Sequence, residues 1–132
     1  MFKVQFYTYK GLYKEIEADS INLPTPDGRR GILPNHMPVM LPVILGVVNA
    51  TVKGENRKFT VADGMFYFEN NEAILISDNI EDVRDIDIEA VKAAEMRARQ
   101  RLSSATRESD VTRAQIALQK ALNKISAYNS EQ

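Results

Sequence analysis

The sequence predicts an α+β fold, with an N-terminal antiparallel β-sandwich over residues 1–84 and a C-terminal antiparallel two-helix hairpin over residues 85–132. Apolar residues in the first part alternate with polar ones, which is the pattern of strands with one buried face. Turn-forming residues separate these short runs at regular spacing, as in sandwiches and barrels. After Gly64 the chain contains no glycine or proline, and from Ala90 it is rich in strong helix formers. We therefore place the only domain boundary near Arg84.

The strands are expected from the N-terminus onward. Phe2, Val4 and Phe6 alternate with polar or amphipathic residues, which indicates a half-buried strand. Residues 24–28 form a turn, because proline fixes φ and glycine accepts a positive φ. Residues 53–56 and 69–72 lie between alternating runs and predict two further hairpins.

Two amphipathic helices are expected in residues 85–132. Acidic side chains at Asp85, Asp87 and Glu89 favour the first helical turn, where they complement the helix dipole. Polar residues 103–109 interrupt the pattern, and Ser109 or Asp110 is expected to cap the second helix. Each helix carries an alanine-rich apolar stripe, formed by Val91, Ala94, Ala98, Leu102 and Ala105 in the first and by Val111, Ala114, Leu118, Ala121, Ile125 and Tyr128 in the second. Alanine buries little apolar area, so we expect the hairpin to be held weakly.

The composition argues against an enzyme and against a metal site. The chain has no cysteine, which excludes disulfides, thiolate catalysis and Cys-based metal sites. His36, the single histidine, lacks a catalytic neighbour, and a structural hydrogen bond in a loop is the simpler interpretation. No His, Asp and Glu cluster has metal-site spacing, and no phosphate-binding glycine loop is present. No apolar run is long enough to cross a membrane, and no targeting segment is expected at the N-terminus.

The charge is distributed unevenly along the chain. Residues 1–91 contain nine lysines and arginines against fourteen acids, whereas residues 92–124 contain eight against three. In the second helix Arg113, Lys120 and Lys124 lie on one side at spacing i, i+7 and i+11. A solvated face is the simpler interpretation, but an acidic head and a basic tail also predict an electrostatic partner for the tail. Nucleic acid is a poor candidate for that partner, since the chain is slightly acidic and aromatic residues do not interleave with the basic ones.

Two prolines bracket a polar tip in residues 31–38, Gly31-Ile32-Leu33-Pro34-Asn35-His36-Met37-Pro38. This segment is either a rigid surface loop or a preformed contact surface, because rigid loops lose little entropy on binding. It closely resembles the GILPxHxP loop of ATP synthase epsilon subunits. Residues 63–66, 85–88 and 113–124 also resemble that family, in the same order and spacing. The resemblance covers essentially the whole chain.

The resemblance implies a ten-stranded sandwich that binds the gamma subunit and lies on the membrane c-ring. It also implies a helical tail that can extend toward the alpha and beta subunits and restrain ATP hydrolysis, its basic helix facing an acidic segment of the beta subunit. The chain would then be a non-catalytic rotor subunit of the central stalk of an F-type ATP synthase, peripheral on the cytoplasmic side of the cell membrane and touching the membrane only through the complex. The resemblance assigns the gamma and c-ring contacts of this chain to Arg29, Arg30, Gly31, Ile32, Leu33, Pro34 and His36. It assigns the inhibitory contacts to Arg113, Lys120 and Lys124.

The chain departs from the family pattern at two places. Ile86 and Asp87 begin a nucleotide-binding I/L-D-x-x-R-A motif, but Ala90 stands where the motif has arginine. Loss of that charge-assisted contact predicts weak or no ATP binding, so no cofactor is expected. The turn that faces the c-ring in the family often carries an acid, whereas Arg29 and Arg30 stand here. The alternative function is a free-standing adaptor or nucleic-acid-binding module, which would not co-purify with gamma, alpha and beta subunits.

Overall fold

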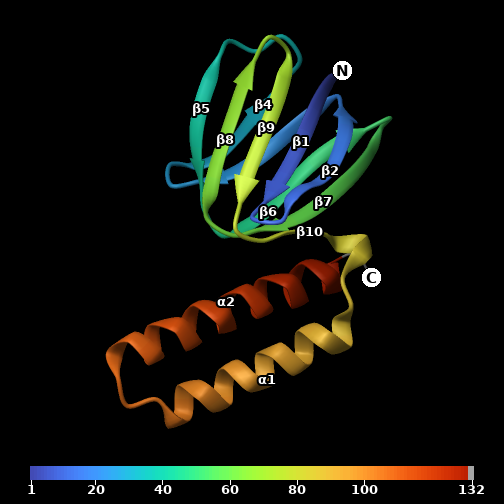
Figure 1. The fold of residues 1–132 in the computed structure, drawn as a ribbon. Coiled ribbons are helices and arrows are strands. Elements are labelled where there is room, and N and C mark those ends of the chain that lie inside the picture. The colour runs from blue at the N-terminus through green and yellow to red at the C-terminus, as the bar shows by residue number, and fades with distance from the viewer. Residues whose placement is uncertain (131–132) are drawn as a thin grey trace. The chain divides into compact units, whose positions relative to one another are not determined.

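The computed structural model describes residues 1–130, which fold as two compact units (Figure 1). The first unit comprises Met1–Asp82, and the second begins at Val83. Ten strands in two five-stranded sheets form the first unit, and one short 3₁₀-helix and two α-helices form the second. The predicted fold class, a β-sandwich followed by a two-helix hairpin, is confirmed.

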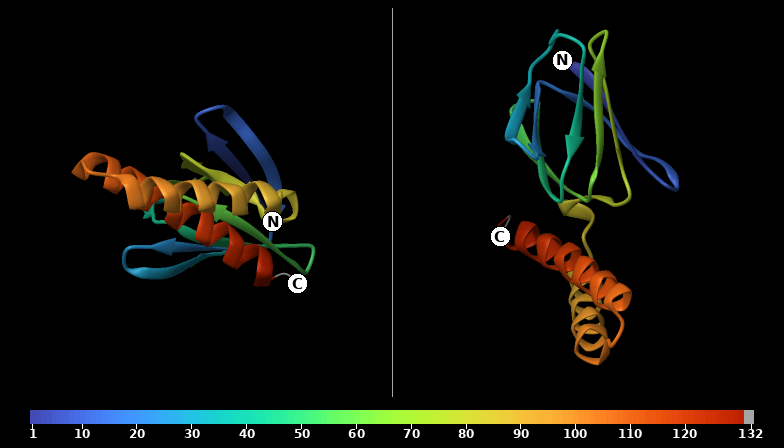
Figure 2. Two further views of the ribbon diagram at one scale, coloured as in Figure 1. Left: turned by 90° about the horizontal axis from the view of Figure 1, so that it is seen from below. Right: turned by 90° about the vertical axis from the view of Figure 1, so that its left-hand side faces the viewer.

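The two sheets of the sandwich are assembled largely from antiparallel neighbours (Figures 1 and 2). One sheet has the order β2-β1-β9-β8-β5, with β1 (Phe2–Thr8), β2 (Gly11–Ala18), β5 (Val39–Val43), β8 (Gly64–Glu69) and β9 (Glu72–Ser77). The other has the order β10-β7-β6-β3-β4, with β3 (Ser20–Thr25), β4 (Gly28–Ile32), β6 (Gly46–Val52), β7 (Glu55–Val61) and β10 (Ile80–Asp82). The only parallel pair among them joins β1 to β9, so the chain crosses between sheets before it returns to β1.

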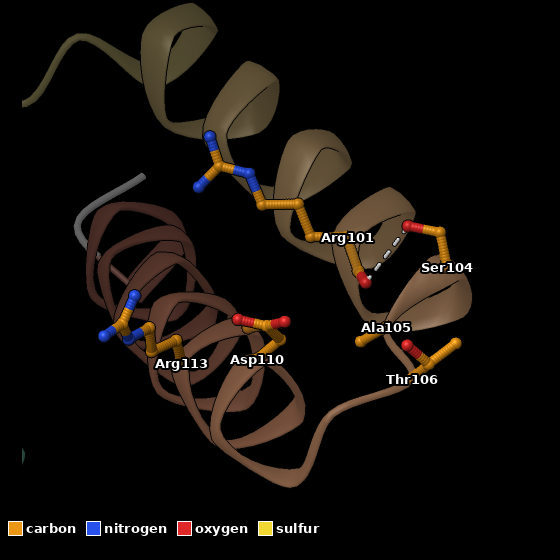
Figure 3. A pocket seen from close by; sticks show the side chains of 7 residues that line it. Arg101, Ser104, Ala105, Thr106, Asp110 and Arg113 are labelled. Carbon is orange, nitrogen blue, oxygen red and sulfur yellow. Dashed lines mark hydrogen bonds between the residues drawn. The ribbon is translucent and has the colours of Figure 1, made fainter.

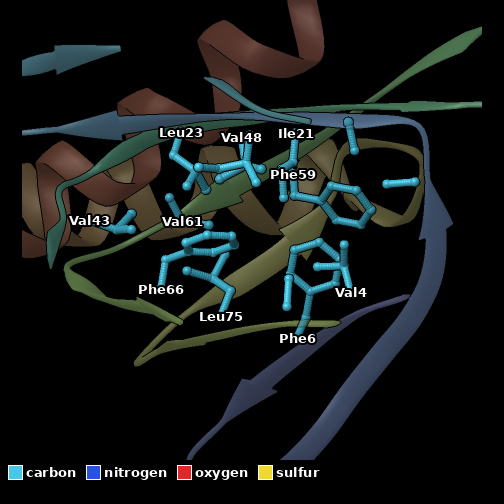
Figure 4. Close-up of a cluster of buried hydrophobic side chains, with 14 of the residues drawn as sticks. Val4, Phe6, Ile21, Leu23, Val43, Val48, Phe59, Val61, Phe66 and Leu75 are labelled. Carbon is cyan, nitrogen blue, oxygen red and sulfur yellow. The ribbon is translucent and has the colours of Figure 1, made fainter. Parts of the chain in front are cut away.

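The core lies between the two sheets and is built from alternate residues of the strands (Figure 4). Phe6 of one sheet stacks on Phe59 of the other, with 4.5 Å between ring centroids. Phe2 meets Phe68 edge-on at 5.3 Å. The alternation read from residues 2–6 therefore identifies the buried face correctly, because side chains of one strand face alternately inward and outward.

The predicted hairpin turns are confirmed, and their backbone angles explain the residues found there. Lys53 and Gly54 have φ of 52° and 81°, and Asn70 and Asn71 have φ of 53° and 59°. Positive φ at both central residues defines a type I′ turn, whose twist matches that of paired strands. Asparagine and glycine adopt this conformation at low cost.

The second unit contains a 3₁₀-helix (Val83–Asp85), α1 (Ile88–Ser104) and α2 (Glu108–Ser130). Asp87 caps α1, where its carboxylate accepts the N–H of Ala90 at 3.2 Å. Asp85 was expected in the first turn of this helix, but it belongs to the 3₁₀-helix instead. The prediction that Ser109 or Asp110 caps the second helix was also wrong. The first helical hydrogen bonds run from the N–H groups of residues 110 and 111 to the carbonyl of Arg107, so the helix begins before both candidates.

The two apolar stripes predicted for the helices are confirmed except at Ala105, which follows the last residue of α1 and has an extended backbone. Each stripe residue is buried or half-buried, and α1 packs along α2. Val91 and Ala98 are the buried members in α1, and Ala114 and Ala121 are buried members in α2. Small side chains therefore form much of this packing, which limits the apolar area that it removes from water.

A buried ion cluster joins the two sheets at β10. The carboxylate of Asp82, 1% exposed, lies 2.7 Å from Nη2 of Arg57 in β7 and 2.9 Å from Nζ of Lys14 in β2. The backbone N–H of Asp82 also donates to the hydroxyl of Tyr13 at 2.9 Å. Because Lys14 belongs to one sheet and Arg57 to the other, Asp82 ties both to the last strand of the sandwich.

Replacing Gly64 with alanine should destabilise the sandwich by about 3 kcal/mol, the upper end of ordinary overpacking. A Cβ at this position would lie 2.0 Å from the carbonyl oxygen of Ile76 and 2.9 Å from Cα of Ser77. Both are backbone atoms of the paired strand β9, so relief requires the β8–β9 ladder to shift. Urea unfolding of the full chain measures the change. Gly31→Ala is the matched control, because its Cβ would meet only Asn22 Nδ2 at 4.0 Å, and equal losses in the two variants would contradict the prediction.

Candidate partner-binding surfaces

The residues predicted to contact gamma or the c-ring divide between a strand and a loop. Arg29, Arg30, Gly31 and Ile32 lie in β4, so the expectation that the two arginines occupy a turn was wrong. The turn is formed by residues 26 and 27, because Thr25 already pairs with Gly28. The Ile32 side chain is fully buried in the sandwich core, so it supports the following loop from inside.

Arg29 and Arg30 lie on opposite faces of their strand and have different environments. The guanidinium of Arg29 donates from Nε to the side-chain oxygen of Asn22 and from Nη1 to the carbonyl of Val47 at 2.7 Å. Burial lowers the pKa of Arg29 from its ordinary value, although an arginine remains charged. Arg30 is exposed, and no other residue within 1–130 pairs with its guanidinium. Of the two arginines, Arg30 is therefore the one whose charge is available to a partner.

The loop from Leu33 to Pro38 is held by local hydrogen bonds. The N–H of Asn35, at φ 63°, donates to the side-chain oxygen of Asn71 in the β8–β9 turn at 2.8 Å. The His36 ring donates from Nδ1 to the carbonyl of Met37 at 2.8 Å and lies edge-on to Phe68. These contacts give His36 a structural role. Leu33 and Met37 are exposed by 64% and 71%, so the loop presents apolar side chains on a fixed backbone.

The outward side of the sheet that contains β5, β8, β9 and β1 carries apolar side chains that the sequence analysis did not identify. Two rows cross this sheet in register, one through Met40, Tyr67 and Ile74 and the other through Pro42, Met65, Ile76 and Tyr7. We call these seven residues the apolar face. Met40 is 61% exposed and Ile76 is 46% exposed. Contiguous exposed apolar surface of this kind marks sites of protein association.

A sequence signal for the apolar face exists in residues 65–68 and 73–76. Both runs are continuously apolar, Met-Phe-Tyr-Phe and Ala-Ile-Leu-Ile. Strict alternation predicts one polar face, whereas a continuous run predicts a strand that is covered on both sides. The inward residues of these runs fill the core, which leaves the outward ones for a partner.

The residues predicted for inhibitory contacts all lie on α2. Arg113 is exposed, and Lys120 and Lys124 are half-buried on the same side of the helix. The residues of the incomplete nucleotide motif lie at the start of the helical unit. Ile86 is buried, and the carboxylate of Asp87 is engaged in capping α1. Residue 90 is an exposed alanine and offers no charged donor there.

One pocket of the helical unit lies between the end of α1, residues 105–107 and the start of α2 (Figure 3). Its volume is about 370 Å³. We call it the hairpin pocket, and it is lined by Arg101, Ser104, Ala105, Thr106, Asp110, Arg113 and Ala114. Within residues 1–130, no group of histidine, aspartate and glutamate side chains is placed to hold a metal ion. None of the helices over this range is long and apolar enough to cross a membrane.

Comparison with known proteins gives the same assignment for both units. Residues 1–83 match the protein family described as "ATP synthase, Delta/Epsilon chain, beta-sandwich domain". Residues 84–129 match the family described as "ATP synthase, Delta/Epsilon chain, long alpha-helix domain". The ATP synthase epsilon chain of Lactobacillus delbrueckii subsp. bulgaricus is 35% identical, over 98% of this chain and 94% of its own length. The epsilon chain of Desulforamulus reducens is 40% identical over 84% of each chain.

Solved structures show the same fold at low sequence identity. A chain of the Euglena gracilis mitochondrial ATP synthase, in an assembly described as OSCP/F1/c-ring, superposes with a TM-score of 0.74 and 17% identity, over 94% of this chain and 79% of its own length. A chain from the central stalk and c-ring of the Tetrahymena thermophila enzyme gives a TM-score of 0.63 and 13% identity, over 96% and 95%. The resemblance inferred from the loop at residues 31–38 is thereby confirmed, and the chain belongs to the ATP synthase delta/epsilon chain family.

Proposed function

We propose that this chain is a non-catalytic rotor subunit of the central stalk of an F-type ATP synthase, in the role of the epsilon subunit. The observation that carries the proposal is the match of both units, in order and over nearly the whole chain, to the two domains of the family. The free-standing adaptor considered from the sequence has no comparable support. In this role the chain transmits rotation between the c-ring and gamma and performs no bond chemistry itself.

The apolar face supports a permanent protein partner, for which gamma is our assignment. Interfaces that persist are more apolar than transient ones, and a monomer rarely leaves a row of such side chains in water. We assign the c-ring contact to Arg30 and to the exposed loop residues Leu33 and Met37. The chain then reaches the cytoplasmic side of the membrane only as a peripheral part of the complex.

The helical unit supports a regulatory role, in which the tail leaves its compact form and restrains ATP hydrolysis. Much of the packing between α1 and α2 rests on alanines, so its loss costs little apolar burial. Met96, Ile116 and Leu122 are exposed on the helices and are available to a second partner. Arg113, Lys120 and Lys124 supply a basic side for acidic surfaces of the alpha and beta subunits. Nucleotide binding is not part of the proposal, because Ala90 lacks a phosphate donor and Asp87 is used as a cap.

Removing residues 85–132 should raise ATP hydrolysis by the reconstituted complex, and so should the triple substitution of Arg113, Lys120 and Lys124 by alanine. We expect roughly tenfold activation, the factor that follows from losing about 1.4 kcal/mol of docking energy. At high salt the triple variant and the unmodified complex should hydrolyse ATP at similar rates, because salt screens the contact that the substitutions remove.

The matched control removes three cations from α1 instead, by Lys92→Ala, Arg97→Ala and Arg99→Ala, and should leave hydrolysis unchanged. If only the deletion activates hydrolysis, the tail restrains the enzyme sterically and not by charge. If neither change activates hydrolysis, the tail has no regulatory role. If the chain does not co-purify with gamma, alpha and beta subunits, the rotor assignment itself is wrong.

A further inference from the structure

The hairpin pocket brings together two unpaired cations from different helices. Arg101 comes from α1, and Asp110 and Arg113 come from α2, with the Asp110 carboxylate between the helices (Figure 3). Within residues 1–130, neither guanidinium has a hydrogen-bond or ion-pair partner, although both line the pocket together with a carboxylate. Arg99, in contrast, pairs with Glu95 at 2.9 Å on the opposite side of α1. The two pocket arginines therefore retain their full set of donors for a ligand.

The backbone around the pocket gives an anion little net attraction, because the end of α1 and the start of α2 line it together. The positive end of the α2 dipole is offset by the negative end of the α1 dipole, so the attraction for an anion comes from the two arginines. The Ser104 hydroxyl donates to the carbonyls of Gln100 and Arg101, which satisfies acceptors at the end of α1. The Thr106 hydroxyl, from the connecting segment, has no partner within residues 1–130 and adds a further donor.

Asp110 determines which anion fits. An ionised carboxylate can only accept hydrogen bonds, so it repels an anion that carries no proton. Hydrogen phosphate retains a P–O–H group at neutral pH, and this group can donate to a carboxylate while its other oxygens accept from arginine. Sulfate has no proton to donate at neutral pH. A pocket with two arginines and one carboxylate therefore selects a protonated tetrahedral oxyanion.

We propose that the hairpin pocket binds phosphate as the free hydrogen phosphate ion. Arg101 and Arg113 hold the phosphate oxygens, and Asp110 accepts the P–O–H proton. The pocket volume of about 370 Å³ exceeds that of one phosphate ion, so waters complete its filling. A bound phosphate would bridge α1 to α2 at the connection between them, and so stabilise the paired helices. The site is separate from the incomplete motif at Ile86 and Asp87, and it does not depend on the rotor assignment.

The test is an amide NMR titration of the full chain with sodium phosphate at pH 7, with ionic strength held constant by sodium chloride. Saturable shifts should appear at Thr106, Asp110 and their neighbours, with a Kd of about 1 mM. Arg101→Gln and Arg113→Gln should each weaken binding about tenfold, whereas Arg99→Gln should leave it unchanged. Circular dichroism of each variant confirms that the helices are retained.

Anion selectivity tests the role of Asp110. Sulfate should bind about tenfold more weakly than phosphate, and Asp110→Asn should bring the two affinities together. A parallel titration with ADP tests the same requirement, because its terminal phosphate has largely lost its last proton at pH 7 and should bind more weakly than free phosphate. Tighter binding of ADP than of phosphate at the same amides would contradict the role given to Asp110. A linear response without saturation, equal binding of sulfate and phosphate by the unmodified chain, or unchanged affinity in both arginine variants would overturn the proposal.

Discussion

Replacing Ile76 with glutamate should abolish binding of the chain to gamma while leaving the sandwich folded. Ile76 lies at the centre of the apolar face, next to Met65 on β8 and Tyr7 on β1. Its side chain is already 46% exposed, so a polar replacement costs the isolated chain little stability. In a complex the same glutamate would be buried without a partner. An unpaired buried charge costs about 3 to 5 kcal/mol, which corresponds to a loss of more than a hundredfold in affinity.

Co-purification and calorimetric titration with gamma measure this loss. Met96→Glu is the matched control, because Met96 is exposed by 63% but belongs to α1 and not to the apolar face. We expect that variant to bind gamma normally. Normal binding of gamma by Ile76→Glu would exclude the apolar face as the gamma contact. If Ile76→Glu has a lowered unfolding midpoint, the lost affinity comes from impaired folding and not from the interface.

Replacing Asp82 with alanine should destabilise the sandwich by about 3 to 5 kcal/mol, the cost of removing one partner from a buried ion pair. The substitution leaves Arg57, only 16% exposed in its side chain, without the carboxylate that lies 2.7 Å from it. Nε of Arg57 is already buried without a hydrogen-bond partner among residues 1–130, so the remaining guanidinium would be poorly satisfied. Lys14 loses the same partner, and with it the tie between the two sheets.

Denaturant unfolding of the full chain, followed by a probe of the β-sheet, measures this effect. Asp78→Ala serves as the control, because its carboxylate is exposed and has no hydrogen bond or ion pair within the described chain. That variant should change stability by less than about 0.5 kcal/mol. A loss of less than about 1 kcal/mol in Asp82→Ala would show that the cluster contributes no more than an exposed ion pair.

Local patterns could be read correctly without the structure. The I′ turns at residues 53–54 and 70–71 were predictable, because positive φ depends on the residues of the turn themselves. The stripes on α1 and α2 were predictable for a similar reason, since helical spacing fixes which residues share a side. The start of the second helix was not predictable in this way. The start of α2 depends on which carbonyl accepts the first helical bonds, and Arg107 carries no side-chain signal for that role.

The contact surfaces were only partly predictable. The sequence located the loop at residues 33–38, but it placed Arg29 and Arg30 in a turn and treated them as equivalent. Strand alternation separates the two arginines, and the carbonyl of Val47, eighteen residues away in the chain, engages Arg29. The apolar face was missed because a continuous apolar run indicates that both sides are covered, but does not say by what.

The class of fold, the family and the amphipathic character of each element follow from the sequence alone, because these depend on residue type and short-range spacing. Which distant groups meet is visible only in the folded chain. Lys14 and Asp82 are separated by 68 positions yet share a buried contact, and Asn35 is fastened by Asn71, 36 positions away. The hairpin pocket likewise exists only because the connection at residues 105–107 folds α2 back along α1 and brings Arg101 and Arg113 to one cavity. Such contacts depend on register and chain reversal, which no local pattern specifies.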